Sequence, residues 1–292
     1  MFNFLKIKNR KKQETPISAT LLHKEPNFLA NEAYKLLRTN IAFALPDTGK
    51  CRVIGITSSI RGEAKSTTAI NLSYVLSQNG KRVLLLDGDL RLPSVAKKLE
   101  VAGAPGLSDA LIDSKGDISA IKPLVNENWH FLPAGTIPPN PSEMLGSAQM
   151  EAYIKKLSES YDFIIVDLPP VNIVSDALVV SPLLDGMIVV VRCNYSEKRE
   201  LSKCIKALEL ANVKILGLLM TAKRDNRPSY SRYKKYTKGG YYKSRYYNNQ
   251  GKSYGKQAEA PVLNSTSDKS AIEGVTEKEK DDRSTQPRST EN

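Results

Sequence analysis

The chain contains 292 residues, 40% of them hydrophobic and 25% charged, a length and composition typical of one α/β domain with disordered ends. Aspartates interrupt its apolar stretches before they reach the roughly 18 residues that a membrane-spanning helix needs, and its N-terminus lacks the apolar core of a secretory signal. Three cysteines without metal-ligand spacing fit a reducing compartment. These features argue against an exported or membrane-spanning chain and predict a cytoplasmic one.

The net charge of +12 lies in the flanks of the chain. Residues 1–24 carry +5 and residues 222–256 carry +10, whereas residues 25–221 are neutral and residues 257–292 carry −3. Basic flanks of this kind bind phosphates or an anionic membrane surface, because Lys and Arg release counterions from any polyanion. The alternative is a solvated tail that its own charge keeps unfolded. No specific nucleic-acid partner is expected.

The first elements precede the core of the fold. Residues 1–27 are polar and basic without any period, so they are expected to form a flexible segment. Apolar residues then recur at helical spacing over 28–45, and the run is ended by Pro46. This pattern predicts an amphipathic helix ahead of the core.

Short apolar segments then alternate with helical patterns. Strands buried on both faces are expected at residues 52–57, 82–86, 163–166, 187–191 and 214–219. Crossover helices are expected at residues 66–77, 175–184 and 196–211. Strands that alternate with helices predict a doubly wound, mostly parallel sheet, which binds ligands at the carboxyl ends of its strands.

The alternating pattern ends at residue 223. Residues 224–256 mix Tyr, Lys, Arg, Gly, Ser and Asn, and residues 257–292 are charged, rich in Ser and Thr, and free of aromatics. Neither segment contains enough apolar surface to fold. We therefore expect one folded domain over residues 28–223, followed by a disordered, tyrosine-rich C-terminal tail.

The strand at 52–57 runs into the loop T-S-S-I-R-G-E-A-K-S-T and then into a helical pattern. Backbone N–H groups of such a loop and the positive end of the helix dipole bind phosphates; Lys65 can reach the β- and γ-phosphates, and the Ser66 hydroxyl can ligate Mg²⁺. The literal motif G-x-x-x-x-G-K-[ST] has glycine where this chain has Ser59 and Ala64, so an ordinary turn is the alternative for the loop taken alone. The expected nucleotide contacts are Ser59, Ile60, Arg61, Gly62, Glu63, Ala64, Lys65, Ser66 and Thr67.

Three aspartates follow the ends of two further predicted strands. Asp87 and Asp89 come after the strand at 82–86, and Asp167 comes after the strand at 163–166. Closely spaced carboxylates repel each other unless a cation or a shared proton lies between them. Each aspartate alone could form a cap or a turn, but their agreement with the phosphate loop favours a magnesium-nucleotide site. The expected metal ligands are Ser66, Asp87 and Asp167.

These motifs resemble those of the bacterial tyrosine kinases that control capsular and exopolysaccharide synthesis, in the form whose cytoplasmic kinase is a separate chain. The resemblance covers roughly residues 28–254 and includes L-L-L-D-G-D-L-R-L-P as the second acid motif (Walker A′) and I-I-V-D-L-P-P as Walker B. It also includes A-G-T-I-P-P-N-P-S-E-M-L at 134–145 and V-S-D-A at 174–177. It implies a P-loop NTPase fold related to the partition and division-site ATPases, with ATP and Mg²⁺ as cofactors.

A cluster of tyrosines lies in the tail, where the family carries its autophosphorylation substrates. The tyrosines are interleaved with Gly, Ser, Asn and basic residues and have almost no aliphatic neighbours, so exposed hydroxyls are expected. Stacking on single-stranded nucleic acid is an alternative use of such a pattern, but the phosphate chemistry on the same chain favours a kinase. The cluster comprises Tyr230, Tyr233, Tyr236, Tyr241, Tyr242, Tyr246, Tyr247 and Tyr254.

The resemblance also implies how the acids and the lysine divide the work of phosphoryl transfer. Asp87 and Asp89 would serve metal binding and deprotonation of the incoming tyrosine, with Asp87 as the hypothesised general base. Asp167 would hold the metal or its water shell. Lys65 and Mg²⁺ would stabilise charge on the transferred phosphoryl group.

Two positions differ from the family's usual residues. Arg61 stands where the family often has Pro, and it is either a second cation on the phosphates or a solvated loop charge. Related ATPases often have an Asn for base recognition after the last strand, whereas this chain has Thr221. Thr221 is therefore included among the expected nucleotide contacts.

The helix ahead of the core carries Glu32, Lys35 and Arg38 on one face. They resemble the family's E-x-x-R-x-x-R assembly motif, which is associated with a ring of subunits in which one subunit offers its tail to a neighbour's active site. Lys35 replaces an Arg and lacks its bidentate fork, so a weaker ring is expected; ordinary intrahelical pairs are the alternative. The resemblance further implies a membrane activator of the polysaccharide chain-length-determinant type, which recruits the kinase to the inner face of the membrane, and a protein-tyrosine phosphatase.

Two other functions are compatible with this fold. A non-kinase ATPase switch of the partition and division-site class usually has an additional lysine early in its P-loop, where this chain has Ser59 to Arg61, and it lacks a tyrosine-rich tail. A silent nucleotide-binding adaptor of a membrane polysaccharide complex is favoured only by Ala64. We therefore predict an ATP-dependent protein-tyrosine kinase that autophosphorylates its tail between subunits and regulates capsular or exopolysaccharide synthesis.

Overall fold

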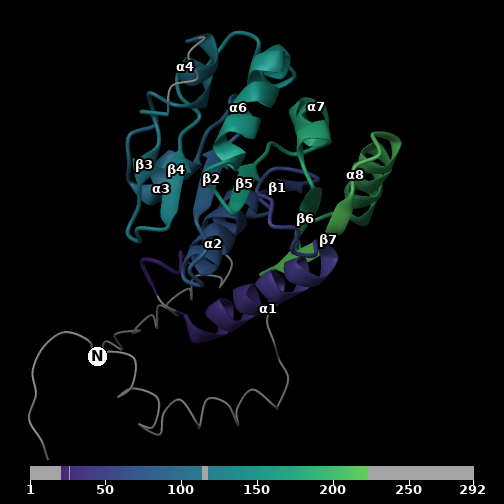
Figure 1. The fold of residues 1–292 in the computed structure, drawn as a ribbon. Helices are drawn as coiled ribbons and strands as arrows, with labels where there is room; N and C mark the ends of the chain where they lie inside the picture. The colour runs from purple at the N-terminus through teal and green to yellow at the C-terminus, as the bar shows by residue number, and fades with distance from the viewer. Residues whose placement is uncertain (1–20, 26, 114–117, 223–292) are drawn as a thin grey trace, which may run out of the picture. The chain divides into compact units, whose positions relative to one another are not determined.

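The computed structural model describes residues 21–25, 27–113 and 118–222. This part of the chain forms a seven-stranded sheet with helices on both faces (Figure 1). The strands are β1 (Arg52–Ser58), β2 (Val83–Asp87), β3 (Lys122–Pro123), β4 (Trp129–Leu132), β5 (Phe163–Asp167), β6 (Gly186–Arg192) and β7 (Ile215–Thr221). The helices are α1 (Phe28–Ala44), α2 (Lys65–Ser77), α3 (Val95–Leu99), α4 (Leu107–Ile112), α5 (Pro141–Leu145), α6 (Ala148–Ser158), α7 (Asp176–Val180) and α8 (Lys198–Leu210).

The strand order is β3-β4-β2-β5-β1-β6-β7, and in the described part of the chain every neighbouring pair is parallel except β3 with β4. β1 is an inner strand. Strands β2 to β5 lie on one side of it, and β6 and β7 lie on the other. This order places the carboxyl ends of β1, β5 and β2 next to one another. The predicted doubly wound, mostly parallel α/β fold is confirmed.

The predicted strands agree closely with the observed ones. All five are present, each within two residues of its expected bounds. The sequence does not predict β3 and β4, because β3 has two residues and β4 only four, too few to establish a period. The helix expected at 175–184 is divided into α7 and a 3₁₀ turn at Ser181–Leu183, because Pro182 has no N–H for continuing the α-helix.

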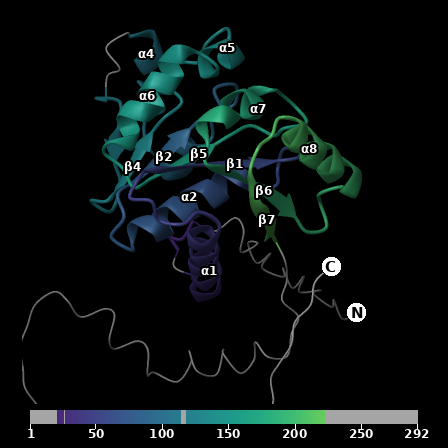
Figure 2. The same ribbon diagram turned by 45° about the vertical axis from the view of Figure 1, so that its right-hand side comes forward.

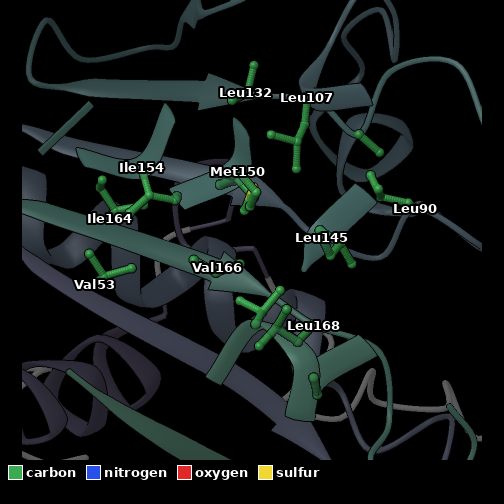
Figure 3. Close-up of a cluster of buried hydrophobic side chains, with 14 of the residues drawn as sticks. Val53, Leu90, Leu107, Leu132, Leu145, Met150, Ile154, Ile164, Val166 and Leu168 are labelled. Carbon is green, nitrogen blue, oxygen red and sulfur yellow. The ribbon is translucent and has the colours of Figure 1, made fainter. Parts of the chain in front are cut away.

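Two apolar layers hold the helices against the sheet. Helices α1, α2 and α3 cover one face and helices α4 to α8 cover the other (Figure 2). On the second face Leu107 of α4, Leu145 of α5 and Met150 of α6 belong to one buried apolar cluster with Ile164 and Val166 of β5 (Figure 3). All five side chains are fully buried, so this face is close-packed up to the carboxyl end of β5.

Helix α2 is enclosed on both sides, because α1 packs on its outer surface and the sheet lies beneath it (Figure 2). Its side chains are consequently buried around nearly the whole circumference, including small polar ones such as Thr68 and Ser73. A helix that is buried on all sides has little freedom to tilt. The loop that precedes α2 is therefore attached to a helix whose position is fixed.

Strand β7 differs from the prediction. The apolar run predicts burial on both faces, but Leu218 and Met220 are 52% and 58% exposed. β7 is an edge strand and pairs only with β6. An apolar run in the sequence therefore does not distinguish an edge strand from a central one.

Candidate active site

The loop between β1 and α2 has the backbone shape of a phosphate-binding loop. β1 ends at Ser58 and α2 begins at Lys65, and the chain turns between them through Gly62 (φ 82°) and Ala64 (φ 73°). Both lie in the left-handed region, which glycine adopts freely and which Ala64 adopts in spite of its methyl group. No side chain caps the first turn of α2. Its N–H groups and the helix dipole therefore form an anion cradle at the end of the loop.

The ammonium group of Lys65 lies between carboxylates from two strand ends. Its Nζ is 3.0 Å from Asp89 Oδ2 and 3.3 Å from Asp167 Oδ1. Burial disfavours the charged form of Lys65, but the charges of Asp167 and Asp89 outweigh this effect and raise its pKa above the usual value. The structure thus brings together the lysine and two of the acids that the sequence predicts as catalytic.

Asp87 and Asp167 are fully buried behind Lys65. The two are register partners in β2 and β5, and Asp87 Oδ2 accepts a hydrogen bond from the backbone N–H of Val95 at 3.2 Å. Burial, followed by the charge of Asp167, raises the pKa of Asp87 to about 8. Burial also raises the pKa of Asp167, although the charge of Lys65 opposes this. One positive charge therefore does not balance this group of acids.

These residues fit a magnesium ion. Ser66 hydrogen-bonds Asp167 and receives a hydrogen bond from Ser94 Oγ at 3.0 Å, which places its hydroxyl beside the buried acids. Among the described residues no three His, Cys, Asp or Glu side chains gather into a ready-made metal cluster. Mg²⁺ in nucleotide enzymes does not require one, because it takes one or two carboxylates and completes its shell with phosphates and water. Ser66, Asp87 and Asp167 would supply that donor set, and the pKa of Asp87 is raised first by its burial and then by the charge of Asp167.

A pocket of about 260 Å³ opens in front of Lys65. Of the predicted site residues, those lining it are Arg61, Gly62, Ala64, Lys65, Ser66, Thr67 and Asp89. Lining residues that the sequence analysis did not assign to the site include Arg91, Leu92, Ser94, Lys98, Pro169, Pro170, Ile173 and Val174. The sequence offered a signal for four of them, because Arg91 and Leu92 belong to the Walker A′ segment and Pro169 and Pro170 to the Walker B segment.

Four other predicted contacts lie behind the loop rather than in the pocket. The fully buried carboxylate of Glu63 accepts hydrogen bonds from Ser59 Oγ at 3.0 Å, from Ile60 N–H at 2.8 Å and from Ser196 Oγ. Thr221 Oγ1 donates to the backbone carbonyl of Glu63 at 3.1 Å. Ser59, Ile60, Glu63 and Thr221 therefore hold the loop in shape, and their side chains do not line the pocket.

Three motifs that lie far apart in the sequence meet beside the pocket. Arg91 donates to Asp176 through Nε at 2.8 Å and Nη2 at 3.1 Å, and Nη2 also donates to Ser142 Oγ at 2.9 Å. Ser142 Oγ in turn donates to Asp176 Oδ1 at 2.5 Å. The Asp176 carboxylate is fully buried, whereas Arg91 is 40% exposed at its side chain. This cluster anchors the segment that follows Asp89 to α5 and α7.

The fold and this site define a P-loop nucleotide-binding protein. The family model described as AAA domain matches residues 51–216, more than half of the chain. The match begins just before β1 and ends within β7, so it covers the loop, the acids and the strands from β1 to β6.

Proteins of known class narrow this assignment. The tyrosine-protein kinase YwqD of Bacillus subtilis (strain 168) is 37% identical over 200 residues, which cover 68% of this chain and 84% of that protein. The crystal structure of the chimerical protein CapA2B2 matches with a TM-score of 0.66 at 32% identity, over 70% of this chain and 90% of that one. The kinase domain of the Escherichia coli tyrosine kinase ETK matches with a TM-score of 0.66 at 28% identity, over 75% and 86%. The chain belongs to the bacterial tyrosine-protein kinase family.

Proposed function

We propose that this chain transfers the γ-phosphoryl group of ATP to tyrosines in its own C-terminal tail and thereby regulates capsular or exopolysaccharide synthesis. The observation that carries the proposal is Lys65 at the start of α2, within 3.0 to 3.3 Å of carboxylates from two other strand ends. The family membership supports the reaction type. The eight tail tyrosines, Tyr230 to Tyr254, lie outside the described residues, and their role as substrates rests on the sequence.

The loop and its lysine would hold the phosphates of ATP. N–H groups at the start of α2 face the pocket, and Lys65 Nζ exchanges part of its contact with Asp89 and Asp167 for the β- and γ-phosphate oxygens. Ser66, Asp87 and Asp167 would bind Mg²⁺, which offsets charge on the phosphates when present. Arg61 lines the pocket and provides a further cation near the loop.

The aspartates of the Walker A′ segment would accept the proton of the substrate. The phenolic oxygen of a tail tyrosine forms a bond to the γ-phosphorus, the bond from that phosphorus to the β–γ bridging oxygen breaks, and the phenolic proton passes to a carboxylate. Without metal, burial raises the pKa of Asp87 to about 8, so its carboxyl is mostly protonated at neutral pH. Bound Mg²⁺ would lower this pKa and leave the carboxylate free to accept a proton. Asp89 is the acid that lines the pocket. We assign general-base function to Asp87 and positioning of Lys65 and the substrate to Asp89.

Two matched variants test these roles. Asp87→Asn should lower tail phosphorylation by about 100-fold or more while Mg-ATP still binds, because a positioned base contributes roughly 10² to 10⁴ in rate. Asp89→Asn should retain more activity at saturating ATP. Phosphotyrosine formation is measured on purified full-length chain supplied with Mg-ATP. Wild-type phosphorylation by an Asp87→Asn variant that binds ATP normally would overturn the assignment.

Kinase, switch and adaptor functions give different results with one preparation. Phosphotyrosine that appears in the full chain and disappears when residues 224–292 are removed supports the kinase. ATP hydrolysis without phosphotyrosine would support a non-kinase switch, and nucleotide binding without turnover would support an adaptor. Ala64 keeps a glycine-like backbone conformation, which supports the kinase and the switch over the adaptor.

We further propose that the chain acts as a homo-oligomer in which one subunit's tail enters a neighbour's site. Within one chain Lys35 pairs with Glu32 at 2.8 Å, and Arg38 Nη1 reaches the backbone carbonyl of Val75 at 3.4 Å. These contacts fit the intrahelical alternative as well as the ring, and they leave Lys35 half-exposed. Light scattering of wild type and of a Glu32→Ala, Lys35→Ala double variant separates the ring from the intrahelical alternative. Only the ring predicts that the double variant forms a smaller particle than wild type.

A membrane partner and a phosphatase complete the proposal. None of the helices in the described ranges combines the length and the apolar character needed to cross a bilayer. We propose that an activator whose cytoplasmic segment binds the kinase recruits it to the inner face of the membrane. Co-expression with a candidate activator segment should raise tail phosphotyrosine, and a protein-tyrosine phosphatase should reset it.

A further inference from the structure

Three consecutive carbonyl groups of the phosphate loop are hydrogen-bonded by side chains that come from another part of the sheet. Tyr195 Oη donates to the carbonyl of Arg61 at 3.1 Å, and Arg192 Nη1 donates to the carbonyl of Gly62 at 3.0 Å. Thr221 Oγ1 donates to the carbonyl of Glu63 at 3.1 Å. The three donors lie at the end of β6, in the turn before α8 and at the end of β7.

Because peptide groups are planar, these hydrogen bonds also fix the direction of the N–H groups on the opposite side of the loop. A trans peptide group is planar, and its carbonyl and the following N–H point in opposite directions. Bonds that hold the carbonyls of residues 61, 62 and 63 on one side therefore direct the N–H groups of residues 62, 63 and 64 to the other side. The pocket is lined by Gly62, Ala64 and Lys65 and by none of the three donor residues.

The turn that carries Arg192 and Tyr195 is itself ordered by its own contacts. Ser196 N–H donates to the carbonyl of Arg192 at 2.9 Å, and Ser196 Oγ accepts from the Arg192 N–H at 2.7 Å. The Arg192 guanidinium stacks over the Tyr195 ring, 4.9 Å from its centroid. Ser196 also hydrogen-bonds the Glu63 carboxylate. The turn thus contacts the loop through both backbone and side-chain groups.

The contact between the turn and Gly62 is tight. A Cβ atom added at Gly62 would lie 2.8 Å from Tyr195 Oη and 3.2 Å from Tyr195 Cζ, and the backbone φ of +82° already disfavours any other residue. Glycine at this position therefore permits the tyrosine to approach the backbone. This requirement is separate from the close approach of a phosphate on the pocket side.

We propose that Arg192, Tyr195 and Thr221 are positioning residues that hold the phosphate loop from behind, so that three successive N–H groups point at the β-phosphate of a bound nucleotide. The inference rests on the proposed nucleotide-binding function. N–H donors that are already in place before binding need no reorganisation when the phosphate binds. Preorganised hydrogen bonds therefore strengthen binding by lowering its free-energy cost. Thr221, expected from the sequence to contact the nucleotide, acts instead through the carbonyl of Glu63.

Variants that remove only a hydroxyl test the proposal. In the full-length chain Tyr195→Phe and Thr221→Val should each weaken Mg-ADP binding by about 3- to 10-fold, and the double variant by about 10- to 100-fold, because each loses one hydrogen bond to the loop. Thr221→Ser keeps the hydroxyl and should bind as wild type does. Tyr161→Phe removes a tyrosine hydroxyl at the opposite end of the sheet and should leave affinity unchanged.

The readout separates positioning from a general loss of structure. Affinities for Mg-ADP and for AMP are measured by titration calorimetry, together with the unfolding temperature of the nucleotide-free protein. We expect a loss that is several-fold larger for Mg-ADP than for AMP, since the affected N–H groups face the β-phosphate. Equal losses of affinity for both nucleotides, or wild-type Mg-ADP affinity in the folded double variant, would overturn the positioning role of these side chains but not the proposed function. A wild-type chain without Mg-ADP binding would overturn the proposed function as well.

Discussion

Asp87 and Asp167 oppose each other as register partners at the carboxyl ends of β2 and β5, and both carboxylates are fully buried. Two neighbouring buried acids cannot both ionise without a compensating cation. Lys65 provides one positive charge close to them, with its Nζ 3.3 Å from Asp167 Oδ1. The site is therefore short of positive charge, and a bound Mg²⁺ ion would relieve this shortage.

This arrangement makes the stability of the nucleotide-free protein depend on pH. The pKa of Asp87 is about 8 in the folded protein, whereas an unperturbed Asp has a pKa of 3.8. Between these two pH values the folded state keeps a proton on Asp87 that the unfolded state releases. The contribution of Asp87 to the free energy of unfolding is therefore fully present below pH 3.8 and is lost as the pH rises towards 8. Asp87→Asn should make the free energy of unfolding depend less on pH over this range.

Urea unfolding at several pH values between about 5 and 9, with EDTA present, measures this effect. The difference in free energy of unfolding between Asp87→Asn and wild type should grow in favour of the variant as the pH rises, by about 1 kcal/mol or more across the range. Parallel profiles for the two proteins would show that Asp87 has an ordinary pKa in the folded state. Comparison of two proteins that differ at one residue removes the contributions of titrating groups that do not interact with Asp87.

The pair of Arg91 and Asp176 should contribute to stability as well as to the shape of the pocket. Arg91→Met removes the partner of a fully buried carboxylate, but water reaches the half-exposed guanidinium, so the expected loss is about 1–3 kcal/mol rather than the larger value for a fully buried pair. Arg82→Met is the matched control, because its 3.9 Å pair with Asp162 is exposed and should change stability by less than about 1 kcal/mol. Equal losses in urea unfolding would contradict a special role for Arg91.

The parts of this site that the sequence predicts are those that follow from strand topology. Asp87, Asp89 and Asp167 stand at or just after the ends of buried strands, and Lys65 begins the helix that follows β1. Parallel strands bring such ends to one edge of the sheet. Residue type and position along the chain are sufficient to group them. The structure adds that Asp89 lines the pocket whereas Asp87 and Asp167 lie behind the lysine.

The parts that could not be predicted depend on side chains distant in sequence. Arg91 and Asp176 are 85 residues apart and meet only because α7 packs beside the segment after β2. Tyr195 lies 134 residues from the carbonyl of Arg61 to which it donates. No local period encodes such contacts, because they depend on how the turn after β6 folds back onto the loop. The same limitation applies to β4, whose four residues are recognisable as a strand only through pairing with β2.

Ala64 provides a test of the loop's backbone shape. Its φ of 73° imposes left-handed geometry, which a β-branched residue tolerates poorly. Ala64→Val should lower the free energy of unfolding by about 1–2 kcal/mol, whereas Ala64→Gly should stay within about 1 kcal/mol of wild type, because relief of strain offsets the extra freedom of the unfolded chain. A valine variant as stable as the glycine variant in urea unfolding would rule out left-handed geometry at this position.

The cysteines should react at rates that follow their environments. Burial raises the pKa of Cys51 to about 11 and that of Cys204 to about 12. Both thiols are therefore protonated at neutral pH, and the Cys204 side chain is fully buried. Iodoacetamide at a pH of about 7.5 should leave Cys204 unmodified in the folded protein and label it fully after denaturation, as mass spectrometry of tryptic peptides can establish. Rapid labelling of Cys204 in the native protein would contradict the packing of α8 on the sheet.

Lys65 and the acids around it are proposed to transfer phosphate to the chain's own tyrosines. The most direct measurement is tail phosphotyrosine, quantified by mass spectrometry in cells that lack any other enzyme able to modify tyrosine, for wild type, Lys65→Met and a Lys206→Met control on the exposed face of α8. We expect Lys65→Met to lower tail phosphotyrosine by about 100-fold or more and Lys206→Met to leave it unchanged. Wild-type levels of tail phosphotyrosine in the Lys65→Met strain would contradict this mechanism.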